Sequence, residues 1–124
     1  MALAQALAIT RAAGDQVFEV KAHIFLGHSF GAANEWERAL AHFEEALTGV
    51  TAYGDRVGEG VVRVNLGRAL LRLGRLDEAE TQINAGLQIH RAADNRPSIV
   101  VALSLLEELA ALRSTLNIPI DDCS

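Results

Sequence analysis

Apolar residues recur along this chain at the three- and four-residue spacing that is typical of helices burying one face. The stretch between Gly14 and Gly54 shows this spacing twice. Its first half carries Val20, Ile24, Leu26 and Phe30, and its second half carries Trp36, Ala39, Leu40, Phe43, Ala46 and Leu47. Both prolines lie after residue 96, so long stretches lack the residue that most strongly breaks helices. The pattern therefore predicts an all-α chain.

The residues between the apolar stretches supply turn signals. Gly54 suits the left-handed position just past a helix end, and Asp55 suits the N-cap of the next helix. Asp94 and Asn95 offer the same turn chemistry one helix pair later, although only glycine takes the left-handed conformation freely. These two turns divide the chain into helix pairs.

Two further signals place the remaining helix ends. We expect Asn34 to be the N-cap of the second helix in its pair, with Glu37 three residues on, as in a capping box. Pro97 falls in the first turn of the last helix, where its missing N–H costs no hydrogen bond. The predicted helices, about six in number, span about 2–13, 16–32, 35–52, 56–73, 75–92 and 96–115.

The pattern repeats with a period of 40 residues. The repeated letters are Gly14-Asp15 and Gly54-Asp55, Leu26-Gly27 and Leu66-Gly67, and Ala39 and Ala79. Chance rarely places such matches in one register, and repeats of this length are typical of helical solenoids. The expected domain, 1–115, holds a half repeat (1–13), two full repeats (16–52 and 56–92) and a half repeat (96–115), and residues 116–124 form a C-terminal tail.

These units resemble the tetratricopeptide repeat family. The first full unit reads Leu26-Gly27-x2-Phe30 and then Ala39-x3-Phe43, and the second reads Leu66-Gly67-x2-Leu70 and then Ala79-x3-Ile83. His23 and Arg63 stand where the family usually has its first aromatic residue. The 40-residue period is similar to a long-helix subclass found in bacterial regulators and scaffold proteins, and it overlaps the HEAT and armadillo periods, which remain an alternative. The resemblance implies an α-solenoid of antiparallel helix pairs.

The repeated small residues have a physical reason. Glycine inside a helix costs about 0.5–1 kcal/mol relative to alanine, so Gly27 and Gly67 imply a gain from close helix packing. Ala39 and Ala79 are small at the facing positions, and Leu26 and Leu66 precede the two glycines. We therefore interpret all six as structural positions of the repeat.

The segment Gly27-His28-Ser29-Phe30-Gly31 also fits G-x-S-x-G, the nucleophile elbow of serine hydrolases. That motif needs a strand before it and an aspartate and a histidine from a parallel sheet. The repeat keeps the glycine, as Gly67, and replaces Ser29 by Ala69. A small serine hydrolase using Ser29 is the alternative to the favoured interpretation, a non-enzymatic binding module.

Composition narrows the range of partners. The formal net charge is −5, and no cluster of Lys and Arg indicates nucleic-acid binding. One cysteine, Cys123, forms no internal disulfide, and no signal peptide or membrane span is recognisable, so we expect a cytoplasmic protein. The four histidines show no metal-ligand spacing, and we expect neither metal nor cofactor. Among them, His42 and His90 are expected at the surface and His23 partly packed.

The resemblance implies that the first helices of successive units line a concave groove. Helical spacing then gives one stripe on each: Lys21, Ile24, Phe25, His28; Val61, Val64, Asn65, Arg68, Arg72; and Val101, Ser104, Leu105, Glu108. The residues expected to bind a peptide are Lys21, Phe25, His28, Asn65, Arg68 and Arg72. In the family an asparagine in this context often holds a peptide backbone. The basic residues favour a protein or peptide partner with an acidic or carboxylate-ended segment.

The predicted half repeats leave apolar faces without an intact partner helix. Leu3 begins one such face, and Ile99, Val100, Leu103, Leu106, Leu109 and Leu112 form the other. Repeat arrays usually end in polar capping helices. We therefore expect either a piece of a longer array or a two-fold homodimer formed through a terminal helix.

Overall fold

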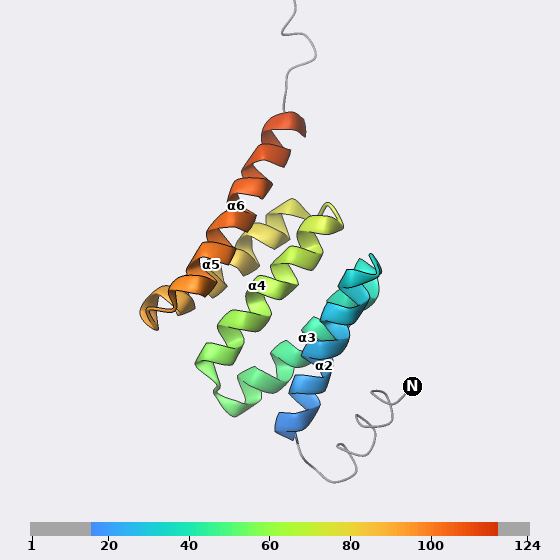
Figure 1. Ribbon diagram of the computed structural model, residues 1–124, viewed down its shortest axis with the longest axis vertical. Helices are drawn as coiled ribbons and strands as arrows, with labels where there is room; N and C mark the ends of the chain where they lie inside the picture. The colour runs from blue at the N-terminus through green and yellow to red at the C-terminus, as the bar shows by residue number, and fades with distance from the viewer. Residues whose placement is uncertain (1–15, 117–124) are drawn as a thin grey trace, which may run out of the picture.

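The computed structural model describes residues 16–116, which form five helices (Figure 1). They are α2 (Gln16–Ala32), α3 (Trp36–Tyr53), α4 (Arg56–Arg72), α5 (Leu76–Ala92) and α6 (Arg96–Leu116). No strand occurs in this range. Each helix begins and ends within one residue of its prediction, and the all-α fold class is confirmed. The predicted helix 2–13, with Leu3, and residues 117–124, with Cys123, lie outside the described residues.

The turns alternate between two positions that the 40-residue register relates. Within helix pairs, Asn34 and Gly74 have φ of 62° and 80°, and between pairs, Gly54 and Asp94 have φ of 69° and 53°. The prediction of Asn34 as an N-cap is therefore wrong: it takes the left-handed position that follows α2. Glu35 stands at the N-cap of α3 instead, and its side chain makes no capping hydrogen bond.

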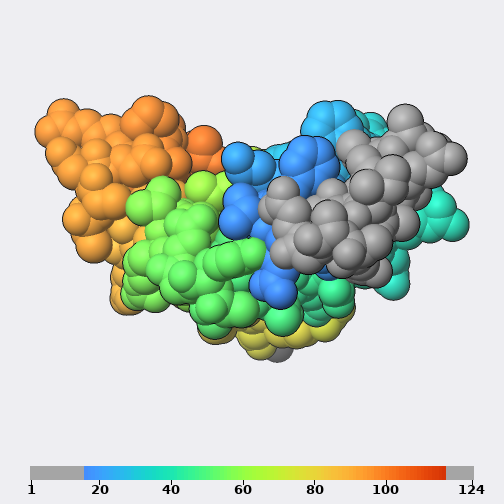
Figure 2. All heavy atoms as spheres, turned by 90° about the horizontal axis from the view of Figure 1, so that it is seen from below, coloured from blue at the N-terminus to red at the C-terminus, as the bar shows by residue number. Residues whose placement is uncertain are grey.

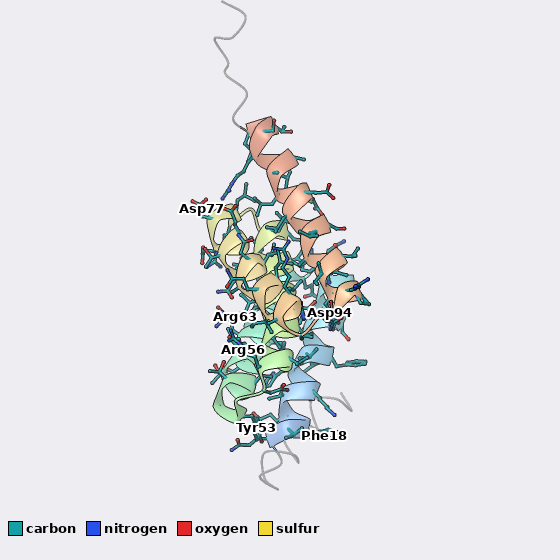
Figure 3. All side chains as sticks on the ribbon, turned by 90° about the vertical axis from the view of Figure 1, so that its left-hand side faces the viewer. Phe18, Tyr53, Arg56, Arg63, Asp77 and Asp94 are labelled. Atoms are coloured by element: carbon teal, nitrogen blue, oxygen red, sulfur yellow. The ribbon has the colours of Figure 1, made fainter. Side chains whose placement is uncertain are left out.

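The two turns between helix pairs are capped as the sequence predicts. The Asp55 carboxylate accepts a hydrogen bond of 2.9 Å from the Gly58 N–H, and Asn95 Oδ1 accepts one of 3.3 Å from the Ser98 N–H. In Figure 3, Tyr53 and Arg56 flank the first of these turns, and Asp94 marks the second. Each cap satisfies an N–H that the first helical turn leaves unpaired.

The helices stack in two layers. Helices α2, α4 and α6 form one layer, and α3 and α5 form the other (Figures 1 and 3). Each helix packs against the next one in the chain, and α4 also contacts α6 directly. The main core joins four helices through aliphatic side chains and one phenylalanine: Ala39, Leu40, Phe43, Val64, Leu66, Ala69, Leu70, Leu71, Ala79, Ile83, Leu87, Ala102, Leu105 and Leu109.

The repeated glycines lie where the two helices of a pair approach closely. A methyl group at Gly27 would lie 2.5 Å from Cε1 of Phe43, and one at Gly67 would lie 2.4 Å from Cγ1 of Ile83. Leu26, Leu66, Ala39 and Ala79 are likewise buried. The six positions singled out in the sequence thus all lie in the interior of the helix pairs.

A second close contact between the helices of each pair also joins a glycine to a large aliphatic residue, but the glycine changes helix between the two pairs. In the first pair Val20 on α2 faces Gly49 on α3, and in the second Gly60 on α4 faces Ile89 on α5. The large residue thus moves from the first helix to the second between equivalent positions. Close packing tolerates such an exchange because the summed volume changes little.

Candidate functional site

The layer of first helices forms a hollow surface. Figure 2 shows the molecule hollowed between α2, in blue, and α6, in orange, with α4, in green, lying lower between them. We call this surface the hollow face. It is the surface on which the sequence places the peptide-binding residues.

The predicted residues of α2 are all exposed. Phe25 has 60% of its surface accessible, and Lys21 lies beside Tyr53 at the wall of an apolar pocket. His28 lies further along the helix, where its ring meets the Phe43 ring edge-to-face at 5.5 Å between centroids. Burial, and then the charge of Arg68, lower the pKa of His28. Near pH 7 its neutral imidazole therefore dominates, so His28 offers hydrogen bonds rather than positive charge.

Asn65 and Arg68 of α4 contact each other, with Asn65 buried at 7% exposure and Arg68 half-buried. Arg68 Nη1 donates a hydrogen bond of 3.3 Å to Asn65 Oδ1. Among the described residues, Arg68 forms no ion pair within 4.0 Å, and it lines a pocket of about 160 Å³ together with His28 and Trp36. Burial lowers the pKa of Arg68, the charge of Arg72 lowers it further, and the charge of Glu108 raises it. Within residues 16–116, this half-buried guanidinium thus feels the charge of Glu108 but has no carboxylate in direct contact.

The side chain of Arg72 interacts with other residues of the same chain. Its guanidinium pairs with the Glu108 carboxylate on α6 and lies 5.9 Å from the centre of the Trp36 ring. This contact joins the end of α4 to α6. Of the two arginines predicted to bind a peptide, Arg68 is therefore the one whose charge is available to a partner.

Two residues of the predicted stripes belong to the core instead. Val64 and Leu105 are 5% exposed and belong to the main core, and Val64 packs against Gly86 on α5. Val61 and Val101, one turn away or less, remain exposed at the hollow face. Helical spacing alone therefore includes buried core residues among those predicted to be exposed on the hollow face.

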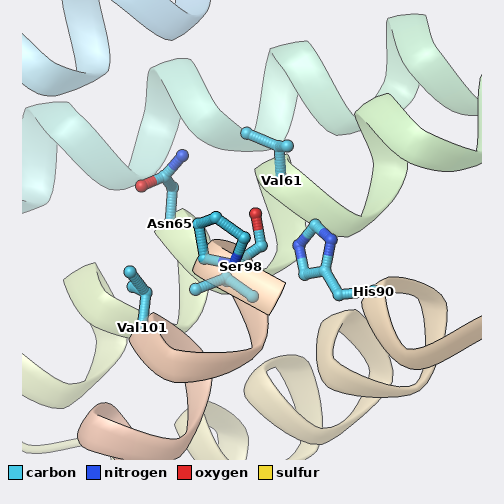
Figure 4. A pocket seen from close by; sticks show the side chains of 7 residues that line it. Val61, Asn65, His90, Ser98 and Val101 are labelled. Carbon is cyan, nitrogen blue, oxygen red and sulfur yellow. The ribbon is translucent and has the colours of Figure 1, made fainter. Parts of the chain in front are cut away.

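A third pocket, of about 190 Å³, opens between α4 and α6, with one wall from α5 (Figure 4). Its lining residues are Val61, Val64, Asn65, His90, Pro97, Ser98 and Val101. His90 was expected at the surface, and that prediction is wrong, since only 1% of its surface is accessible. The repeat register carries the missing signal: His90 is equivalent to Val50, which is 3% exposed.

The other two histidines, His23 on α2 and His42 on α3, contact each other across the first helix pair. His23 is buried, and its Nδ1 lies 2.9 Å from Nδ1 of His42, so one of these nitrogens donates and the other accepts. The His42 ring also stacks on Phe30, with 5.4 Å between centroids. His42, predicted at the surface, is therefore half-buried and packed against two rings.

The serine of the hydrolase-like motif lies within α2. The residues before and after Ser29 are helical, and the side chain is exposed. A nucleophile elbow requires a strand that leads into a sharp turn, which residues 16–32 do not form. Within residues 16–116 no three side chains of His, Cys, Asp or Glu form a metal-binding group. None of the helices described is both long and apolar enough to cross a membrane.

Comparison with known proteins agrees with the repeat geometry. A family model described as tetratricopeptide repeat matches residues 32–96, which covers the segment from the end of α2 to the start of α6. No curated protein matches the chain. The matched segment is half of the chain and contains Asn65, Arg68 and His90.

Proposed function

This chain belongs to the tetratricopeptide repeat family, a protein-interaction fold that is generally non-enzymatic, and from that premise we propose that its hollow face binds an acidic peptide segment of a partner protein. Arg68 of α4 is the anchoring residue in this proposal. Asn65 and His28 supply neutral hydrogen-bonding groups beside it. The bound segment carries a side-chain or terminal carboxylate.

The state of Arg68 is the observation that carries the proposal. A guanidinium that is partly removed from water and bonds to no carboxylate directly is costly, and a carboxylate that pairs with it in two hydrogen bonds recovers much of that cost. The other arginines of the hollow face and its rims already have carboxylates: Arg72 pairs with Glu108, and Arg96 lies 3.7 Å from Asp94. An incoming carboxylate is therefore directed to Arg68 rather than spread over a general basic surface.

Lys21 and Phe25 extend the proposed site along α2. Both are exposed, and both stand on the helix that also carries His28. Lys21 adds a flexible positive charge, and Phe25 adds an apolar surface that a peptide side chain can cover. Their contribution to affinity is smaller than that of Arg68, because exposed charges are strongly screened.

We also propose the wider setting that the sequence suggested. The 40-residue period is similar to that of a long-helix subclass found in bacterial regulators and scaffold proteins, and we propose such a role for this chain in the cytoplasm. Self-association through a terminal helix also stays a prediction. Leu109 is 2% exposed and belongs to the core, so the exposed residues of α6 would have to form the interface instead. The exposed apolar residues of α6 are Val100, Val101, Leu103, Leu112 and Leu116.

Selection from a random peptide library displayed on phage tests the proposal without an identified partner protein. Wild-type protein should enrich peptides rich in Asp and Glu. Arg68→Glu should lose that enrichment, whereas Arg91→Glu, an equal change at an exposed position of α5, should keep it. Enrichment of neutral or basic peptides by the wild type, or an acidic preference that survives in Arg68→Glu, would contradict the proposal.

A further inference from the structure

The pocket between α4 and α6 has a polar group that the fold leaves unused. His90 projects from α5 into its wall, and Figure 4 shows the ring beside Ser98 and across from Asn65. The ring nitrogen Nδ1 is fully buried and has no hydrogen-bond partner within residues 16–116. Buried polar atoms are nearly always paired, and an unpaired one destabilises the fold. Because Nδ1 has no accessible surface, a ligand in the pocket would bond to the other ring nitrogen, Nε2, and fix the ring in place.

The chemistry of the walls selects a neutral ligand group. No Lys, Arg, Asp or Glu lines the pocket, so a charged group would be buried there without a counter-charge. The N–H of Ser98, at the start of α6, is already bonded to Asn95 Oδ1 at 3.3 Å. A hydroxyl both donates and accepts, so it pairs with the neutral imidazole whichever nitrogen carries the proton.

The size of the pocket favours a ligand with an aromatic ring. Its volume of about 190 Å³ exceeds the roughly 150 Å³ of an engineered apolar cavity that binds benzene. Val61, Val64 and Val101 supply apolar walls for the faces of such a ring. The side chain of serine or threonine would leave most of the space unfilled. Among neutral hydroxyl-bearing side chains, the phenol of tyrosine fits both the volume and the unpaired histidine.

We propose that this pocket takes a tyrosine side chain of the partner, with the ring between the valines and the hydroxyl hydrogen-bonded to His90. The proposal rests on the hollow face being a peptide-binding surface, and it adds a residue preference to that surface. Asn65 lines this pocket and is bonded to Arg68. A partner segment therefore carries its tyrosine close to its carboxylate.

Two small amides test the pocket by NMR titration of the whole chain. N-acetyl-tyrosinamide should shift the amide signals of residues 61–65 and 98–101 in a saturable manner. N-acetyl-phenylalaninamide, which lacks the hydroxyl, should bind about tenfold more weakly, since one hydrogen bond is lost. His90→Phe should bind the two amides equally, and a thermal melt verifies that this variant is folded.

A matched pair of tryptophan variants keeps the test sharp. Val101→Trp fills the pocket from an exposed position and should abolish binding of the tyrosine amide. Val100→Trp, its neighbour outside the pocket, should leave binding unchanged. The proposal is overturned if no saturable shift occurs, if both amides bind wild type equally, or if Val101→Trp binds as well as Val100→Trp.

Two further arms separate this proposal from its alternatives. The tyrosine amide is uncharged, so its binding to wild type should not change with salt concentration, even if the acidic-peptide proposal fails. Free p-cresol carries the same phenol without peptide groups and should bind more weakly than the amide. Tighter binding of p-cresol would assign the pocket to a small phenolic molecule and would overturn its assignment to a partner's tyrosine.

Discussion

Replacing Gly67 by alanine is the sharpest test of how the helix pairs are held together. The added methyl would lie 2.4 Å from Cγ1 of Ile83 and 3.2 Å from the carbonyl oxygen of Ala79. Ile83 has no accessible surface, so it has no open space into which to move. Overpacking of this kind costs about 1–3 kcal/mol, whereas alanine favours the helix by about 0.5–1 kcal/mol over glycine. We expect a net loss of about 0.5–2 kcal/mol.

A double-mutant cycle assigns that loss to the Ile83 contact. Ile83→Ala alone should cost about 2–5 kcal/mol because it leaves a cavity. In that background Cγ1 and Cδ1 are gone, so Gly67→Ala should become neutral or stabilising by up to about 1 kcal/mol. Urea denaturation followed by circular dichroism measures all four proteins, and Ser29→Ala, within about 0.5 kcal/mol of wild type, is the control. Equal effects of Gly67→Ala in both backgrounds would refute the close-approach explanation.

Three further predictions concern charge and exposed surface. Burial lowers the pKa of His42 more than the charge of Glu45 raises it, so the unfolded chain binds the proton more readily than the folded protein. The free energy of unfolding should therefore fall as pH drops through about 6.5. His42→Gln should flatten that pH dependence, and equal slopes for the variant and wild type would contradict the prediction. Arg113 on α6 bonds to Glu80 at 2.7 Å and also pairs with Asp77 on α5, so Arg113→Ala should speed amide hydrogen exchange at the end of α6 but not in α4. If α6 mediates self-association, Leu103→Glu should lower the mass measured by light scattering, and an unchanged dimer would exclude that face.

Much of the fold was predictable because the sequence contains an internal repeat, so that equivalent positions can be compared within one chain. The 40-residue register relates Gly27 to Gly67, and both lie at close helix contacts. Helix ends were predictable where one residue type dominates the conformation, as Gly54 does. Asn34 was misplaced because asparagine favours both an N-cap and the left-handed turn position, and local sequence does not separate the two.

The candidate site was less predictable, because its properties depend on contacts between helices. Helical spacing puts Arg68 and Arg72 on one face. It does not reveal that Glu108, 36 residues from Arg72, bonds directly to Arg72 and acts on Arg68 only through its charge. His90 looked like a polar residue at the end of an amphipathic helix. Its ring lies against α4, where a methyl group at Gly60 would lie 3.1 Å from Cε1 of His90, and its equivalence to Val50 was the available sign of its burial.

A charge-swap titration tests the central claim, that Arg68 recognises a carboxylate on the hollow face. An acidic peptide from the display selection and a twin with its acidic residues replaced by lysine are titrated calorimetrically into wild type, Arg68→Glu and Arg91→Glu. Wild type and Arg91→Glu should prefer the acidic peptide by at least about tenfold, less at high salt, and Arg68→Glu should prefer the lysine twin. The same preference for the acidic peptide in all three proteins would contradict the account.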